Sequence, residues 1–183
     1  MAVFSNYFND DYCCHFYFVK LKYTSQHIYN LLSEIPDPEI PVITIVELGV
    51  IRHVEVIDDT SIELKITPTY SGCPAMKQIE DDIRKKLAEH GFAAIKICTI
   101  YSPPWTTDWI TPEAKEKLRQ YGIAPPEHTT EDKSWLTGKP KTVLCPRCKS
   151  SNTKLISQFG STACKSLYQC SDCLEPFDYF KCI

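Results

Sequence analysis

The sequence predicts an α+β protein in which an α-β-β-α-β domain is followed by a small β domain of the zinc-ribbon type. Segments of helical and of strand period alternate through the first two thirds of the chain, whereas two Cys-x-x-Cys pairs stand near the C-terminus. Between them, residues 127–141 are polar and have no periodicity, which is typical of a linker. We therefore expect an N-terminal arm over residues 1–24, a first domain over 25–126 and a ribbon over 142–183.

The first domain begins with a predicted helix and a predicted β-hairpin. Ser25 can cap a helix that the prolines at 36, 38 and 41 end, and its apolar face consists of Ile28, Leu31, Leu32 and Ile35. Two segments of strand period follow at residues 54–56 and 62–66, separated by Asp58-Asp59-Thr60. This pattern predicts an antiparallel hairpin with one buried face.

A second helix, a third strand and a last helix complete the predicted first domain. Pro74 suits the first turn of a helix whose apolar positions keep helical spacing until Gly91. Residues 92–100 are the third predicted strand. The last helix is expected to begin at the cap Thr111, with Pro112 in its first position, and to end at Gly122.

Four cysteines form the most specific pattern in the sequence: Cys145, Cys148, Cys170 and Cys173. Structural zinc takes four ligands in tetrahedral geometry, and each Cys-x-x-Cys turn presents two thiolates. The 21 residues between Cys148 and Cys170 leave room for a hairpin of strands near 153–157 and 166–169. A structural zinc ion is therefore expected, with a rubredoxin-like iron or a redox dithiol as alternatives. We expect Cys164 and Cys182 to be small buried residues without a metal role.

Cys73 stands where a glycine-containing turn meets the second predicted helix. Unpaired N–H groups and the helix dipole favour a thiolate at such a position. With the acidic residues Asp37 and Glu39, Cys73 is a candidate site for transient iron or an iron-sulfur cluster. The simpler alternatives are a buried structural cysteine and two solvated acids in a proline-rich turn. No histidine stands in a recognisable catalytic motif, so catalytic residues are not predicted.

A tryptophan-rich segment is a candidate docking patch for a partner protein. Its residues are Trp105, Asp108 and Trp109, and aromatic side chains are enriched in protein interfaces. Core packing and capping are the alternative explanation.

Composition and charge limit the classes of function. Ten cysteines outside a secretory context favour reduced thiols and metal ligands, so we expect a cytoplasmic protein. The sequence predicts neither a membrane span nor a signal peptide. The net charge of −3 combines +4 over residues 139–183 with −7 elsewhere. A charge of +4 is weaker than a continuous phosphate backbone usually requires, so nucleic-acid binding is not favoured.

Several motifs resemble a known family. Asp37-Pro-Glu-Ile-Pro41 and Thr67-Pro-Thr-Tyr-Ser-Gly-Cys-Pro74 are similar to the MIP18 (DUF59) domain of iron-sulfur assembly factors. Residues 102–110, 121–126, 159–165 and 175–183 resemble the PaaD (PaaJ) family, subunits of the phenylacetyl-CoA 1,2-epoxidase complex. The resemblance covers about residues 25–183 and joins both predicted domains.

The resemblance implies an accessory role in aerobic phenylacetate degradation. The implied partners are the oxygenase and reductase subunits of the epoxidase system, whose iron-sulfur or di-iron centre the chain would help to assemble or insert. It also implies that Cys73 is the transient ligand, with Asp37 and Glu39 beside it, and that the four ribbon cysteines bind zinc. The alternative is a structural adaptor that holds the oxygenase components together.

Overall fold

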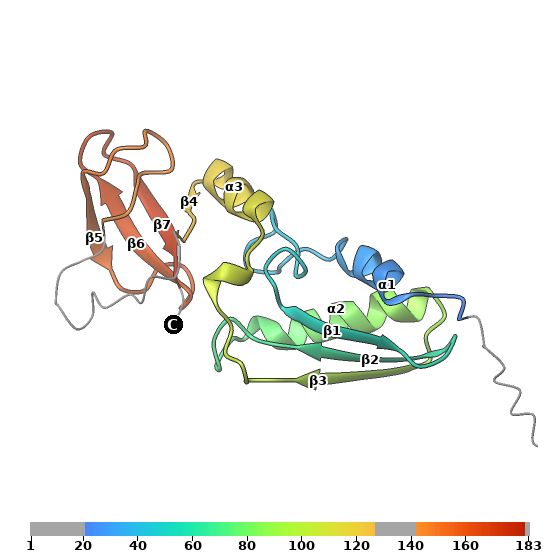
Figure 1. Ribbon diagram of the computed structural model, residues 1–183. Helices are drawn as coiled ribbons and strands as arrows, with labels where there is room; N and C mark the ends of the chain where they lie inside the picture. Colours follow the sequence, from blue (N-terminus) through green and yellow to red (C-terminus); the bar gives the residue numbers. More distant parts are fainter. Residues whose placement is uncertain (1–20, 127–141, 182–183) are drawn as a thin grey trace, which may run out of the picture.

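The computed structural model describes residues 21–126 and 142–181, which Figure 1 shows as two sheets with helices around the first. Most of the predicted arm, the predicted linker and Cys182 lie outside the described residues. The first part has the element order α1-β1-β2-α2-β3, and the C-terminal part is a small β-sheet that carries the four ribbon cysteines. The predicted fold class is therefore confirmed.

Helix α1 spans Ser25–Leu32, and its cap is Thr24 rather than the predicted Ser25. Thr24 has extended backbone angles, and its hydroxyl oxygen accepts a hydrogen bond of 3.2 Å from the amide of His27. Thr24, the residue before the first helical residue, therefore has the side chain that faces the unpaired amides. The apolar face of the helix lies where it was predicted, with Ile28, Leu31 and Leu32 buried.

The first sheet has the strand order β1-β2-β3. Strands β1 (Ile51–Val56) and β2 (Ser61–Ile66) form the predicted antiparallel hairpin. Strand β3 (Ala94–Thr99) pairs with β2 in parallel, and this requires a crossover, which α2 (Ala75–Glu89) supplies. Figure 1 shows α2 lying along one face of the sheet, where Ile62, Leu64 and Ile66 are buried.

Helix α3 (Pro112–Tyr121) leads from the first sheet toward the second. It follows the short 3-10 helix η1 (Thr107–Trp109), is capped by Thr111 as predicted, and ends at Gly122, whose φ is 93°. Glycine adopts this left-handed conformation without steric cost because it has no Cβ atom.

The second sheet has the order β4-β7-β6-β5 and includes a strand from the first part. Strands β5 (Thr153–Ser157) and β6 (Lys165–Cys170) form the predicted hairpin, and β7 (Pro176–Phe180), which was not predicted, pairs with β6. Strand β4 (Ile123–Ala124), directly after α3, pairs in parallel with β7. Hydrogen bonding therefore crosses the predicted domain boundary at residue 126, and the division itself stays a prediction.

Two ribbon residues pack into the core of the first part. Phe180 is 1% exposed and Cys164 is 4% exposed, and both belong to the same buried cluster as the residues of α1, α2 and the first sheet. The rings of Phe180 and Trp105 pack in a T-shaped arrangement with 5.9 Å between centroids. The rest of the ribbon has its own apolar cluster, which includes Tyr168, Phe177 and Tyr179. Within residues 21–126 and 142–181, none of the helices combines the length and apolar character needed to cross a membrane.

Candidate functional site

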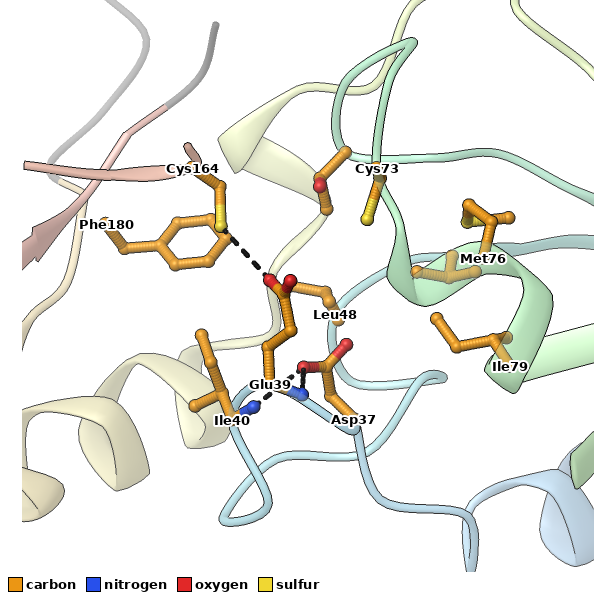
Figure 2. A pocket seen from close by; sticks show the side chains of 11 residues that line it. Asp37, Glu39, Ile40, Leu48, Cys73, Met76, Ile79, Cys164 and Phe180 are labelled. Carbon is orange, nitrogen blue, oxygen red and sulfur yellow. Dashed lines mark hydrogen bonds between the residues drawn. The ribbon is translucent and has the colours of Figure 1, made fainter. Parts of the chain in front are cut away.

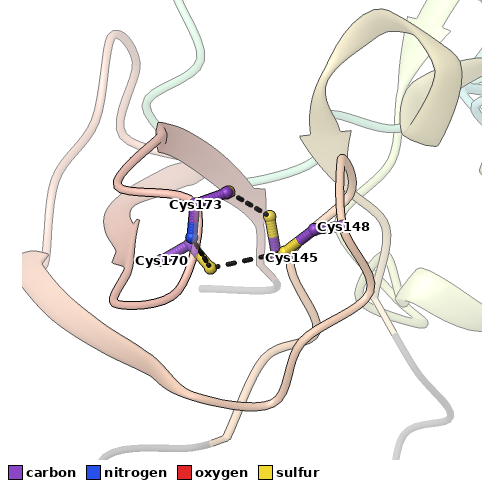
Figure 3. Close-up of side chains that lie close together, drawn as sticks. All are labelled: Cys145, Cys148, Cys170 and Cys173. Carbon is purple, nitrogen blue, oxygen red and sulfur yellow. Dashed lines mark hydrogen bonds between the residues drawn. The ribbon is translucent and has the colours of Figure 1, made fainter.

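The four ribbon cysteines come together at one end of the second sheet (Figure 3). Cys145 and Cys148 lie on the turn before β5, whereas Cys170 ends β6 and Cys173 follows it. The four sulfur atoms all lie within 4.8 Å of one another. The spacing predicted from the sequence thus produces a single four-thiol cluster.

The cluster has the dimensions of a tetrahedral thiolate site. The sulfur atoms of Cys145 and Cys173 are 3.7 Å apart, and those of Cys148 and Cys170 are 3.5 Å apart. A metal bound to four sulfurs at about 2.3 Å requires sulfur-sulfur distances of about 3.8 Å. The amide nitrogen of Cys173 lies 3.5 Å from the sulfur of Cys170, and this hydrogen bond is the largest of several causes that lower the pKa of the Cys170 thiol to about 7. The residues therefore fit a structural metal ion.

Cys73 lies two residues before the start of α2, in a turn closed by a hydrogen bond of 3.1 Å from its amide N–H to the carbonyl of Tyr70. Figure 2 shows its sulfur pointing into a small cavity that Asp37 and Glu39 also line. The structure therefore brings together the three residues predicted as a transient site, although Cys73 is more than 30 positions from the two acids in sequence.

Asp37 supports the proline-rich loop from inside. Its Oδ1 accepts hydrogen bonds from the amides of Glu39 at 2.9 Å and Ile40 at 2.8 Å. Asp37 is 5% exposed, so it is not the solvated acid of the simpler explanation. Burial raises the pKa of its carboxyl, and the hydrogen bonds from the two amides oppose that rise. Both amides donate to the same oxygen, Oδ1, so Oδ2 takes part in neither hydrogen bond.

Cys73 is half-buried, and burial raises the pKa of its thiol. The amide of Ala75 and the hydroxyl of Thr69 lower that pKa, whereas the negative charges of Glu39 and Asp37 raise it further. The thiolate stabilisation that we expected from the helix start is therefore outweighed by burial and by the acidic neighbours.

A second cysteine, Cys164, lines the same cavity (Figure 2). Its thiol donates to Oε2 of Glu39 over 3.7 Å and lies 3.0 Å from the hydroxyl oxygen of Thr162. Cys164 is buried, as predicted, but its place beside Glu39 was not predicted. No local pattern could have found it, because the ribbon packs beside Cys73 only in the folded chain.

The tryptophan-rich segment divides into a buried and an exposed side. Trp105 is 4% exposed, and its indole nitrogen donates to the carbonyl of Leu48 at 2.9 Å, so Trp105 is a core residue. The guanidinium carbon of Arg52 lies 3.4 Å from the ring centroid of Trp109, which is partly buried. Docking stays a prediction for the exposed Asp108 and for Trp109.

Comparison with known proteins identifies the family. Residues 25–91 match the family model of the iron-sulfur cluster assembly protein, and residues 129–181 match that of the PaaD zinc beta ribbon domain. The chain is 51% identical over 156 residues to a protein of Escherichia coli (strain K12) that is named as a 1,2-phenylacetyl-CoA epoxidase subunit, and the match covers 85% of this chain and 92% of that protein. This chain belongs to the PaaD family of phenylacetyl-CoA epoxidase subunits. The predicted resemblance is confirmed.

Shorter relatives of this PaaD family member match about half of the chain. An Fe-S protein maturation auxiliary factor of Porphyromonas gingivalis (strain ATCC BAA-308 / W83) is 34% identical over 96 residues, which are 52% of this chain and 90% of that protein. A crystal structure of a DUF59 domain from Bacillus anthracis is 28% identical and covers 51% of this chain and 90% of its own, with a TM-score of 0.48. Cys73 lies within residues 25–91, which match the iron-sulfur cluster assembly family model, whereas Cys164 lies within residues 129–181, which match the zinc ribbon model.

Proposed function

We propose that this PaaD family member is an accessory factor that assists the assembly or insertion of the iron-sulfur or di-iron centre in a phenylacetyl-CoA epoxidase system. The observation that carries the proposal is the position of Cys73, whose sulfur faces a cavity lined by Asp37 and Glu39 within the part that matches iron-sulfur assembly proteins. The names of its relatives, an epoxidase subunit and iron-sulfur maturation factors, support the same role. The partners would be the oxygenase and reductase subunits.

The two groups of thiols would have different tasks. The ribbon cysteines would hold a permanent zinc ion, because four thiols at tetrahedral spacing leave no open coordination position for chemistry. Cys73, half-buried and facing carboxylates, offers fewer and weaker ligands, which suits an ion or cluster that must be released again. Both tasks need reduced thiols, and this need supports a cytoplasmic location.

The test is the metal content of the partners. The oxygenase and reductase subunits are produced with the full chain, without it, with Cys73→Ser and with Cys98→Ser. Cys98 is the matched control, since it is also half-buried but lies on β3 and does not line the cavity. We expect a several-fold loss of iron from a partner when the chain is absent or carries Cys73→Ser, and no loss with Cys98→Ser. Equal iron in all four preparations would refute the proposed role.

An adaptor role is the second candidate, and the surface of the ribbon favours it. Four large apolar side chains of the ribbon are 48–69% exposed: Leu144, Ile156, Phe159 and Leu174. An adaptor would bind its partners through such residues, independently of Cys73. A pull-down with Leu174→Ser and Phe159→Ser should then lose oxygenase components, while Cys73→Ser retains them in fixed stoichiometry.

A further inference from the structure

We propose that Cys164 is the second sulfur ligand of the Cys73 site, so that Cys73, Cys164 and Glu39 together bind one ferrous ion. This inference deepens the proposed function and rests on it, because it names the cargo as a single ion and gives the ribbon a part in holding it. Cys164 then has a metal role that the sequence did not indicate.

The two thiols reach the cavity from opposite parts of the molecule. Cys73 belongs to the turn before α2, and Cys164 belongs to the loop before β6. The carbonyl of Cys164 accepts a 2.9 Å hydrogen bond from the amide of Lys181, and this bond fixes the loop against the end of β7. Figure 2 shows the carboxylate of Glu39 between the two sulfur atoms, with Cys164 3.7 Å from Oε2. The ribbon therefore closes the cavity with a potential ligand.

The size of the cavity favours a single ion over a cluster. Its volume is about 10 Å³, which is about the space needed for one water molecule. An iron-sulfur cluster contains several iron and sulfide atoms and is usually held by four cysteines. Two thiols and one carboxylate around a space of this size suit one small cation.

The donor set selects the kind of cation. Thiolates favour thiophilic divalent ions such as Fe²⁺ and Zn²⁺ over Mg²⁺ or Ca²⁺, which take oxygen ligands. Binding would displace the thiol protons of Cys73 and Cys164. Lys165, 4% exposed and close enough for its charge to act on Cys164 and Asp37, would offset part of the negative charge that thiolates and carboxylates bring.

The site is looser than the ribbon cluster. Among residues 21–126 and 142–181, only the four ribbon cysteines form a group with all ligand atoms within 4.8 Å of one another. Cys73, Cys164 and Glu39 must therefore move closer to bind an ion together. A site that has to tighten binds more weakly than a preformed one, as an ion in transit requires.

The experiment uses the full chain with one equivalent of zinc for the four ribbon cysteines, and it is done without oxygen. It measures how much additional Fe²⁺, and separately Co²⁺, the chain binds. Cobalt bound to thiolates absorbs in the near ultraviolet in proportion to its number of sulfur bonds. We expect one additional ion for the unmodified chain and for Cys98→Ser. With Cys164→Ser, the sulfur-cobalt absorption should fall to about half per bound ion, and the affinity should fall by about tenfold or more.

Several outcomes separate this inference from the proposed function. If Cys164→Ser leaves the affinity and the absorption unchanged while Cys73→Ser abolishes binding, Cys164 is not a ligand. The proposed function would still stand. Two or more irons with acid-labile sulfide per chain would replace the single ion with a cluster and overturn the inference. Zinc content and the urea midpoint of Cys164→Ser and Cys164→Ala establish that the ribbon is folded. If both variants lose zinc, we would conclude that Cys164 is structural, which also overturns the inference.

Discussion

Gly49 lies in the turn before β1 and touches the segment that carries Trp109. Its φ is 75°, and a Cβ atom there would stand 2.7 Å from Cβ of Trp109 and 2.9 Å from its carbonyl oxygen. Gly49→Ala therefore combines left-handed strain with a clash against the backbone. We expect it to lower the free energy of unfolding by roughly 2–4 kcal/mol.

The control for Gly49 is Gly91, which has a φ of 93° but open space where a Cβ atom would stand. Gly91→Ala should cost only the left-handed strain, about 1 kcal/mol. Urea unfolding of both variants gives the difference. If the two substitutions cost the same, the segment around Trp109 accommodates the added methyl group of Gly49→Ala without a clash.

Glu47 connects the loop before β1 to α3. Its carboxylate accepts from the amide of Thr44 at 2.9 Å and from the ammonium of Lys117 at 2.6 Å. Partial burial opposes ionisation, but these bonds outweigh it and leave the pKa below its ordinary value of 4.5. A carboxyl with a lowered pKa in the folded state stabilises the fold above its unfolded pKa, and that stabilisation disappears as the pH falls through the folded value.

Glu47→Gln should therefore cost stability at neutral pH and not in acid. The glutamine oxygen can still accept from Thr44, so the loss is that of a partly exposed ion pair, about 0.5–1 kcal/mol at neutral pH. Urea unfolding across the acid range should show the two proteins converging below the lowered pKa of Glu47. A difference that persists in acid would show that the ion pair is not its cause.

The helices and strands that were predicted correctly are those that local periodicity encodes. The helices and the β1–β2 hairpin were found because their apolar residues repeat within the segment itself. Strand β7 was missed, although Asp178 separates the apolar Phe177 and Tyr179, because five residues beside the last zinc turn give too short a pattern to stand out. The pairing of β4 with β7 and the place of Cys164 depend on contacts between distant segments, which periodicity does not report.

The same division between local and distant contacts distinguishes two phenylalanines of β7. Phe180 packs into the first part against Trp105, whereas Phe177 stacks with Tyr168 inside the ribbon, both with 5.9 Å between ring centroids. Removing either ring should cost about 3–5 kcal/mol. We expect Phe180→Ala to shift the indole N–H resonance of Trp105 and to leave zinc retention unchanged.

Phe177→Ala should have the opposite effect, because its ring lies in the same apolar cluster as Cys145 and Cys170. Zinc release to a chelator should become faster, while the Trp105 resonance changes little. Equal effects of both variants on zinc release would mean that the two apolar clusters are not energetically separate.

For the whole molecule, the ribbon is more than an appended module, because it forms one wall of the cavity at Cys73. We expect its fold to depend on a metal ion at the four-thiol cluster, since a segment of about 40 residues buries too little apolar surface to fold alone. Loss of the metal from the ribbon cysteines should therefore expose Cys73, because Cys164 and Phe180 would leave the shared core and the cavity wall.

Chelation of the ribbon metal should accordingly make Cys73 more reactive. Burial is the largest cause of the raised pKa of Cys73, with the charge of Glu39 adding to it. Without the ribbon wall, the thiol becomes more exposed and its pKa falls toward its ordinary value, so a larger fraction is thiolate at mildly alkaline pH. Alkylation of Cys73, followed by mass spectrometry, should become several-fold faster after chelation. Cys98 on β3 does not line the cavity and should keep its rate, whereas an unchanged rate at Cys73 would show that the ribbon does not shield it.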